Sequence, residues 1–234
     1  MLHKLSIKNL YCCIAAGFFS SSLFSQTTST FTIKAGEDIS AVYKQAFKYP
    51  EFRNGKVVFS YGSPAGGKMN YNLIIGKIQF IDEKNDTLVI ADEAAIKLIT
   101  IGTDTFYYDR DNYVELLANY GKVKMALQQR IKFIDEKNIG AFGIPTSTQN
   151  IDNYNTLRAN NTYSLKVNKD LVFSKEDRYY FREGENNFLV ANKKNILKEF
   201  PRKKKVIENY LKEHDINYNN EEDLKSLFGY LATH

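Results

Sequence analysis

Two aromatic doublets with charged neighbours are the residues of this sequence best suited to contact a ligand. They read FYYD at 106–109 and RYYFRE at 178–183. Side chains of a strand alternate between its two faces, so one tyrosine of each doublet shares a face with a charged residue while the other faces a core. Half-exposed tyrosines could stack on a glycan or a peptide, although many tyrosines in sheets only pack against their neighbours. The candidate ligand-binding residues are Tyr107, Asp109, Asp111, Tyr180 and Arg182.

A basic cluster near the C-terminus is a second candidate surface. Residues 202–205 supply Arg202, Lys203, Lys204 and Lys205. Such a cluster can attract an anionic surface, and an exported protein meets the phosphates of a cell envelope rather than nucleic acid. The competing interpretation is a solvated helix face that nearby glutamates balance. The sequence therefore predicts another envelope protein or an anionic envelope surface as partner, and no nucleic acid.

The first 25 residues have the pattern of an export signal. Lys4 and Lys8 precede an apolar run over residues 10–19, and small polar residues follow it. The run is about half as long as the roughly 20 residues that a membrane span needs. We expect cleavage after Ser25, or alternatively after Ser22, and no transmembrane span in the remaining chain. Loss of the two lysines lowers the formal net charge from +5 to +3. The expected location is the periplasm rather than the cell surface or the exterior.

Cysteine and histidine usage argues against most catalytic chemistries. Cys12 and Cys13, the two cysteines of the chain, would leave with the signal. No thiolate nucleophile, disulfide or cysteine metal ligand would then remain. His214 and His234 are too few for a histidine metal site, and no serine lies in a G-x-S-x-G elbow. We predict no catalytic residue, no metal and no cofactor.

The middle of the chain has the pattern of short strands. From Gly55 the apolar period is two, and turn residues separate the runs. No gap between Gly55 and Asp109 can hold the helix of a parallel crossover, so the strands are expected to be antiparallel, as a meander, a sandwich or a small barrel-like sheet. Residues 123–134 fit a strand with a bulge or bend near 128–130, and a helix is the alternative.

Helical spacing appears near both ends of the chain. Residues 37–47 predict a short helix. Near the C-terminus, Asn192 can cap one helix, Pro201 suits the first position of the next, and an Asn at the start of NNEEDL can cap a third. The predicted fold is α+β, mainly antiparallel β with a short N-terminal helix and a C-terminal pair or trio of helices. Its expected parts are the signal peptide (1–25), an N-terminal tail and helix (26–54), a β-rich domain (55–190) and a packed helical segment (191–234).

The six residues FIDEKN occur twice, at 80–85 and at 133–138. The flanking sequences differ, which argues against a duplicated domain. Asp can accept a hydrogen bond from the backbone two residues on, and Asn tolerates a left-handed conformation. We therefore predict a turn at both copies, in preference to a paired-carboxylate site or a cation site.

Most of the mature chain resembles a group of exported proteins of Bacteroidetes. The resemblance rests on YPEFRNGKVVF, KMNYNLIIGKIQFIDEKNDTLVIAD, IGTDTFYYD and NKKNILKEFPRKKKVIENYLKEHDINYNNEEDLKSLFGYL. It implies export and no particular activity, so no residue receives a role from it. The leading hypothesis is a non-catalytic envelope protein, a module that binds or supports another envelope component. The alternative is an Asp/Glu-dependent hydrolase that acts on envelope glycan or peptide.

Overall fold

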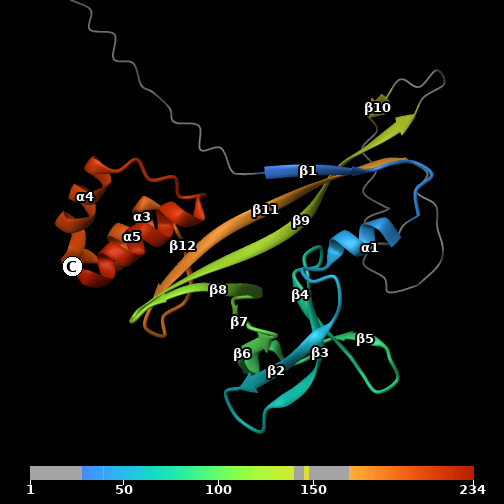
Figure 1. Ribbon diagram of the computed structural model, residues 1–234, viewed down its shortest axis with the longest axis horizontal. Coiled ribbons are helices and arrows are strands. Elements are labelled where there is room, and N and C mark those ends of the chain that lie inside the picture. Colours follow the sequence, from blue (N-terminus) through green and yellow to red (C-terminus); the bar gives the residue numbers. More distant parts are fainter. Residues whose placement is uncertain (1–27, 39, 140–144, 148–168) are drawn as a thin grey trace, which may run out of the picture.

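The protein is built on one antiparallel sheet with helices at one end, as the computed structural model in Figure 1 shows. The structure describes residues 28–38, 40–139, 145–147 and 169–234. The strands are β1 (Thr28–Ile33), β2 (Arg53–Phe59), β3 (Ala65–Asn72), β4 (Lys77–Ile81), β5 (Thr87–Val89), β6 (Ile96–Ile101), β7 (Asp104–Asp109), β8 (Asn112–Tyr120), β9 (Val123–Ile139), β10 (Pro145–Ser147), β11 (Asp170–Glu183) and β12 (Leu189–Val190). The helices are α1 (Ser40–Ala46), α3 (Lys193–Glu199), α4 (Lys204–Glu213) and α5 (Glu221–Thr233), with short 3₁₀ turns η1 (Glu93–Ala95) and η2 (Pro201–Lys203).

The strands follow the order β1-β11-β9-β8-β7-β6-β2-β3-β4-β5, with β10 beside β9 and β12 beside β11. The expectation of a mainly antiparallel sheet followed by helices is confirmed. No helix in the described part of the chain is long and apolar enough to cross a membrane. The predicted signal peptide (1–25) lies outside the described residues.

The long strands β9 and β11 connect the two ends of the molecule (Figure 1). They pair from Val123 opposite Glu183 to Lys137 opposite Asp170. Residues 123–134 are therefore strand and not helix. The bulge expected near 128–130 is not there, because the pairing with β11 is continuous through these residues and its register shift lies opposite the Val172–Phe173 step. Residues 145–147 form β10, which pairs with the end of β9.

The odd-numbered residues of β9 keep to one face of the sheet through residues 128–130, so no bulge is needed there. One face of β9 carries Val123, Met125 and Leu127, then Gln129, and then apolar residues again. The first three lie under the C-terminal helices, whereas Ile131 belongs to the larger core between β2–β7 and α1. Gln129 thus continues the inward face at the polar boundary between the two cores, and the alternation of the strand is not broken.

Local sequence signals place the C-terminal helices as expected. The side chain of Asn192 accepts a hydrogen bond from the backbone of Asn195 and begins α3, and Asn220 caps α5 through the backbone N–H of Asp223 in the same way. Pro201 occupies the first turn of η2, directly before α4. The stripe of α5 that the spacing predicted is fully buried against β9 and β11, and it consists of Leu224, Leu227, Phe228 and Leu231.

The two FIDEKN copies adopt different structures. In the first copy the carboxylate of Asp82 accepts hydrogen bonds from the backbone of Lys84 (2.9 Å) and Asp86 (2.8 Å), and Asn85 is left-handed with φ 68°. This confirms the predicted turn. The predicted turn at the second copy is wrong, because β9 runs through it to Ile139. Pairing with β11 on one side and β10 on the other overrides the local preference of these residues.

Replacing Asp82 with alanine is expected to lower the free energy of unfolding by about 1 kcal/mol, since the turn then loses two hydrogen bonds that close it at an exposed site. Urea denaturation of the Asp82→Ala variant measures the change. Lys84→Ala is the matched control, because only the backbone of Lys84 takes part in the turn. Equal stability of the Asp82→Ala variant and the unchanged protein would contradict the role given to this carboxylate.

Candidate functional site

A pocket of about 390 Å³ lies between the β7–β8 turn and β12. Its apolar lining comes from three places in the chain: Val114 on β8, Phe188 before β12, and Leu189 and Val190 on β12 itself. The pocket therefore depends on the fold, which brings the β7–β8 turn and β8 beside β12, the strand that follows β11. Its volume lies at the lower end of the range for small-molecule sites.

A chain of hydrogen bonds fixes the polar side of this pocket. The Tyr180 hydroxyl donates to Gln128 Oε1 (3.2 Å), and Gln128 Nε2 donates to Asn112 Oδ1 (2.6 Å). Asn112 Nδ2 donates to the carbonyl of Arg110 (2.8 Å). Gln128 is itself buried. The chain holds the side chains of Tyr180 and Asn112 in place before any ligand arrives.

Asp109 and Arg110 form the rim of the pocket. Asp109 Oδ2 accepts hydrogen bonds from the backbone N–H of Phe188 (3.2 Å) and from Nε and NH2 of Arg110 (3.2 and 3.1 Å). The same Arg110 NH2 also donates to the carbonyl of Phe188. These contacts tie the β7–β8 turn to the segment before β12. Asn195 completes the rim by donating Nδ2 to Val190 O (2.9 Å).

The β7–β8 turn has an unusual composition for its geometry. Arg110 and Asp111 both have positive φ, 46° and 66°. Hairpin turns of this kind strongly favour Asn-Gly, and left-handed non-glycine residues cost about 1–2 kcal/mol each. The next hairpin turn along the chain has Gly121 with φ 67°. Backbone strain of this kind persists where the side chains are needed for another role. Here the side chain of Arg110 forms part of the rim of the pocket.

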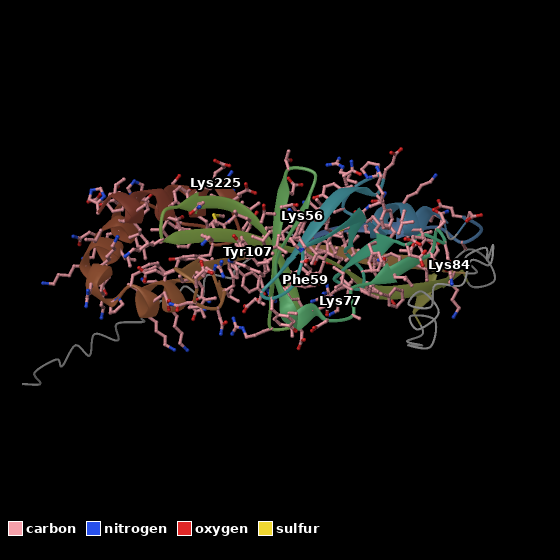
Figure 2. All side chains as sticks on the ribbon, turned by 90° about the horizontal axis from the view of Figure 1, so that it is seen from below. Lys56, Phe59, Lys77, Lys84, Tyr107 and Lys225 are labelled. Atoms are coloured by element: carbon pink, nitrogen blue, oxygen red, sulfur yellow. The ribbon has the colours of Figure 1, made fainter. Side chains whose placement is uncertain are left out.

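Four of the five predicted ligand-binding residues come together around Phe188. The ring of Tyr107 lies 5.7 Å from that of Phe188, and the guanidinium of Arg182 lies over both rings, at 4.5 and 4.8 Å from their centres. Tyr180 and Asp109 line the pocket together with Phe188. The fifth residue, Asp111, lies apart and accepts a hydrogen bond from the Tyr108 hydroxyl (2.8 Å). Figure 2 places Tyr107 near the middle of the elongated molecule, between the helical end and the remaining strands.

The predicted anion-binding cluster at 202–205 is only partly available. Lys203 Nζ donates to the carbonyl of Leu231 at the end of α5, and so it serves the packing of the helices. Lys204 Nζ lies 3.9 Å from Glu208 on the same helix, a distance that adds little stability at an exposed site. Arg202, Lys204 and Lys205 are exposed. Three of the four cations are thus placed to meet a partner directly.

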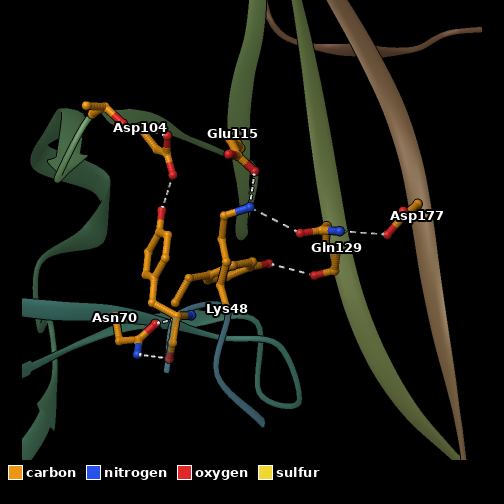
Figure 3. Close-up of polar contacts among 9 residues, drawn as sticks. Lys48, Asn70, Asp104, Glu115, Gln129 and Asp177 are labelled. Atoms are coloured by element: carbon orange, nitrogen blue, oxygen red, sulfur yellow. Dashed lines mark hydrogen bonds and ion pairs between the residues drawn. The ribbon is translucent and has the colours of Figure 1, made fainter. Parts of the chain in front are cut away.

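A second polar cluster lies inside the protein, where the two cores meet (Figure 3). Lys48 Nζ contacts Glu115 Oε2 at 2.7 Å and Gln129 Oε1 at 3.3 Å. Gln129 Nε2 donates to Asp177 Oδ1 (3.1 Å), its cross-strand neighbour on β11, and the Tyr71 hydroxyl donates to the carbonyl of Gln129 (3.1 Å). The side chains of the ion pair are 18% (Lys48) and 12% (Glu115) exposed. We call Lys48, Glu115, Gln129 and Asp177 the seam network.

Burial raises the pKa of Glu115 in the seam network and of the neighbouring Tyr71. Desolvation raises the pKa of Glu115 above its usual value, and the hydrogen bond and charge of Lys48 oppose that rise. Desolvation also raises the pKa of Tyr71 to about 12. Nearby, the Tyr49 hydroxyl donates to Asp104 Oδ2 (2.6 Å), and burial and this bond raise the pKa of the phenol. Each charged group here has its partner within the chain, which suits a structural role.

The described lining of the pocket holds few groups that could take part in acid–base chemistry. Among the described residues that line it, Asp109 is the single carboxylate, and it already accepts three hydrogen bonds. General acid–base hydrolysis needs two carboxyl groups across the scissile bond. In the parts of the chain that the structure covers, no group of three or more His, Cys, Asp and Glu side chains is placed to hold a metal ion.

Sequence reasoning missed Arg110, Phe188 and Asn195, together with Leu189 and Val190 of β12. The signal for Arg110 was present, since YYDRDN places two non-glycine residues at the centre of a two-residue hairpin turn. No local pattern marks Phe188 or Asn195. Their part in the pocket follows from the return of the chain after β11, which only the fold reveals.

The comparisons with known proteins gave no match: no family model, no curated protein and no solved structure is similar to this chain.

Proposed function

We propose that this chain is a non-catalytic exported envelope protein that binds its ligand in the pocket between the β7–β8 turn and β12. The observation that carries the proposal is the hydrogen-bonded chain from Tyr180 through Gln128 to Asn112, which fixes the polar wall of the pocket in advance. Preorganised polar groups favour binding because little conformational entropy is lost when the ligand arrives. The basic residues near the signal-like apolar run support export, and the proposed location is the periplasm.

A ligand with one apolar and one polar face fits the lining best. Val114, Phe188 and the β12 side chains offer apolar contacts, whereas Arg110 and Asn195 offer hydrogen-bonding groups at the rim. Sugar rings combine a C–H face with hydroxyls at the edge, so a glycan fragment of the envelope is the proposed ligand class. The exposed Arg202 and Lys205 would hold the protein near an anionic envelope surface.

Filling the pocket is expected to abolish ligand binding. Tryptophan in place of Val190 adds an indole to the lining, so a glycan fragment that binds the unchanged protein should show at least a tenfold loss of affinity, about 1.4 kcal/mol. Chemical shift changes in NMR spectra during titration with fragments of envelope glycan measure it. Val89→Trp is the matched control, because Val89 is 44% exposed on β5 and does not line the pocket.

Two outcomes would contradict this proposal. One is binding that the Val190→Trp variant retains while its urea midpoint matches the unchanged protein. The other is release of a smaller product during the same incubation, which would establish the hydrolase alternative.

A further inference from the structure

Two cations face each other across β9 and β11, on the sheet face that carries Tyr180. Lys124 and Arg182 are directly paired in the register of these strands. Their side chains are 16% and 11% exposed, so both charges are largely withdrawn from water. Like charges that lie directly opposite each other on neighbouring strands are destabilising unless an anion lies between them.

Glu185 supplies that anion, and it is held loosely. Its Oε1 lies 3.4 Å from Lys124 Nζ and its Oε2 lies 3.4 Å from Arg182 NH2, so each oxygen serves one cation. The Glu185 side chain is 80% exposed, on the tight turn that follows β11. The charges of Arg182 and then of Lys124 lower the pKa of Glu185. One exposed carboxylate with two long contacts leaves the pair of cations with one positive charge in excess.

Arg182 is also fixed in place and incompletely satisfied. The rings of Tyr107 and Phe188 lie against its guanidinium, which sets the plane in which it can bind. Its Nε is buried and has no hydrogen-bond partner in the described part of the chain. Buried donors without partners are uncommon and call for an explanation. A group with three acceptor oxygens could reach both cations and, after a small shift, this nitrogen as well.

We propose that Lys124 and Arg182 form a binding site for a tetrahedral oxyanion, a phosphate group of the ligand, and that Glu185 occupies this site until the ligand displaces it. Arginine and lysine together are the usual protein groups for phosphate. Phe188 is shared with the neighbouring pocket, since it lines the pocket and lies against Arg182. The inference rests on the proposed function for the rest of the ligand, but the phosphate site can be tested alone.

The test measures binding of inorganic phosphate by NMR titration of the full mature chain and its variants. Because Glu185 is an intramolecular competitor, the Glu185→Gln variant is expected to bind phosphate roughly tenfold more tightly than the unchanged protein. Lys124→Met in the Glu185→Gln background should abolish the binding. Acetate titrated in parallel is expected to bind more weakly than phosphate, since it has two oxygens.

Glu222→Gln is the matched control for the change in charge. Glu222 is also 80% exposed and pairs with a lysine, Lys225, at 3.2 Å. Equal tightening by Glu222→Gln, or no tightening by Glu185→Gln, would overturn the proposal. The pocket variant Val190→Trp should leave phosphate binding unchanged, so failure of the phosphate site and failure of the glycan pocket can be told apart. Vesicles of anionic and of neutral phospholipid show whether a lipid headgroup can supply the phosphate. In an Arg202→Ala and Lys205→Ala background, which removes the surface contact proposed above, binding to vesicles that survives Lys124→Met would count against this site.

Discussion

Replacing Phe181 with alanine is expected to lower the free energy of unfolding by about 3 to 5 kcal/mol. Phe181 on β11 is fully buried under the C-terminal helices, with its ring 5.8 Å from Phe200 and 5.2 Å from Phe228. It joins the sheet to both the end of α3 and the centre of α5. Removal of the ring would leave a cavity between elements that share few other aromatic contacts. Urea denaturation followed by far-ultraviolet circular dichroism measures the loss.

Tyr61→Ala is the control for Phe181, because Tyr61 is 70% exposed and its hydroxyl contacts only Asp92. This variant should change stability by less than about 0.5 kcal/mol. If Phe181→Ala cost no more than Tyr61→Ala, the helices would not depend on the sheet for their stability. The packing of α5 on β9 and β11 would then contribute little to the fold.

The C-terminal helices could be predicted because their signals are local. Asn192 and Asn220 each accept a hydrogen bond from a backbone N–H three residues later, and the apolar stripe of α5 repeats every three to four residues. Capping and helical periodicity depend on neighbours within one or two turns. A single sequence is therefore enough to place these elements and the face that each buries.

The candidate site could be predicted only in part. Alternation within a strand put Tyr107 with Asp109 and Tyr180 with Arg182, and the structure brings these four together. These residues lie on β7 and β11, and β8 and β9 separate the two strands in the sheet. Their approach around Phe188 depends on the register of strands that are more than 70 residues apart in the chain. The second FIDEKN copy shows the same limit, since a strand partner decides whether those six residues turn.

The seam network explains how one sheet can carry two cores on the same face. Along the inward face of β9, Gln129 separates Leu127 under the helices from Ile131 in the larger core. On β11, Asp177 is the cross-strand partner of Gln129, and Lys48 approaches Gln129 from the segment after α1 (Figure 3). Polar residues at such a boundary need partners, because an unpaired buried group is costly. Lys48 is the one cation that this network contains.

Replacing Lys48 with methionine is therefore expected to lower the free energy of unfolding at neutral pH by about 3 kcal/mol, because Glu115 would be left largely buried without its partner. Gln129 would also lose the donor to its Oε1. Urea denaturation of Lys48→Met at neutral pH measures the effect. The double variant Lys48→Met with Glu115→Gln should recover much of the loss, since a neutral amide is cheaper to bury than a carboxylate. A double variant as unstable as Lys48→Met alone would contradict the role given to the ion pair.

The stability of Lys48→Met relative to the unchanged protein is also expected to depend on pH. Burial raises the folded pKa of Glu115 above that of an exposed glutamate, so its favourable contribution to stability is complete in acid, below the unfolded pKa, and is lost as pH rises through the folded pKa. Lys48 opposes the rise, and its removal moves the folded pKa further up. The stability gap between Lys48→Met and the unchanged protein should therefore be small in acid, where Glu115 is protonated in both, and widen toward neutral pH. With Glu115→Gln in both backgrounds the gap should no longer vary with pH over this range, and a gap that still widened would assign the effect to another group.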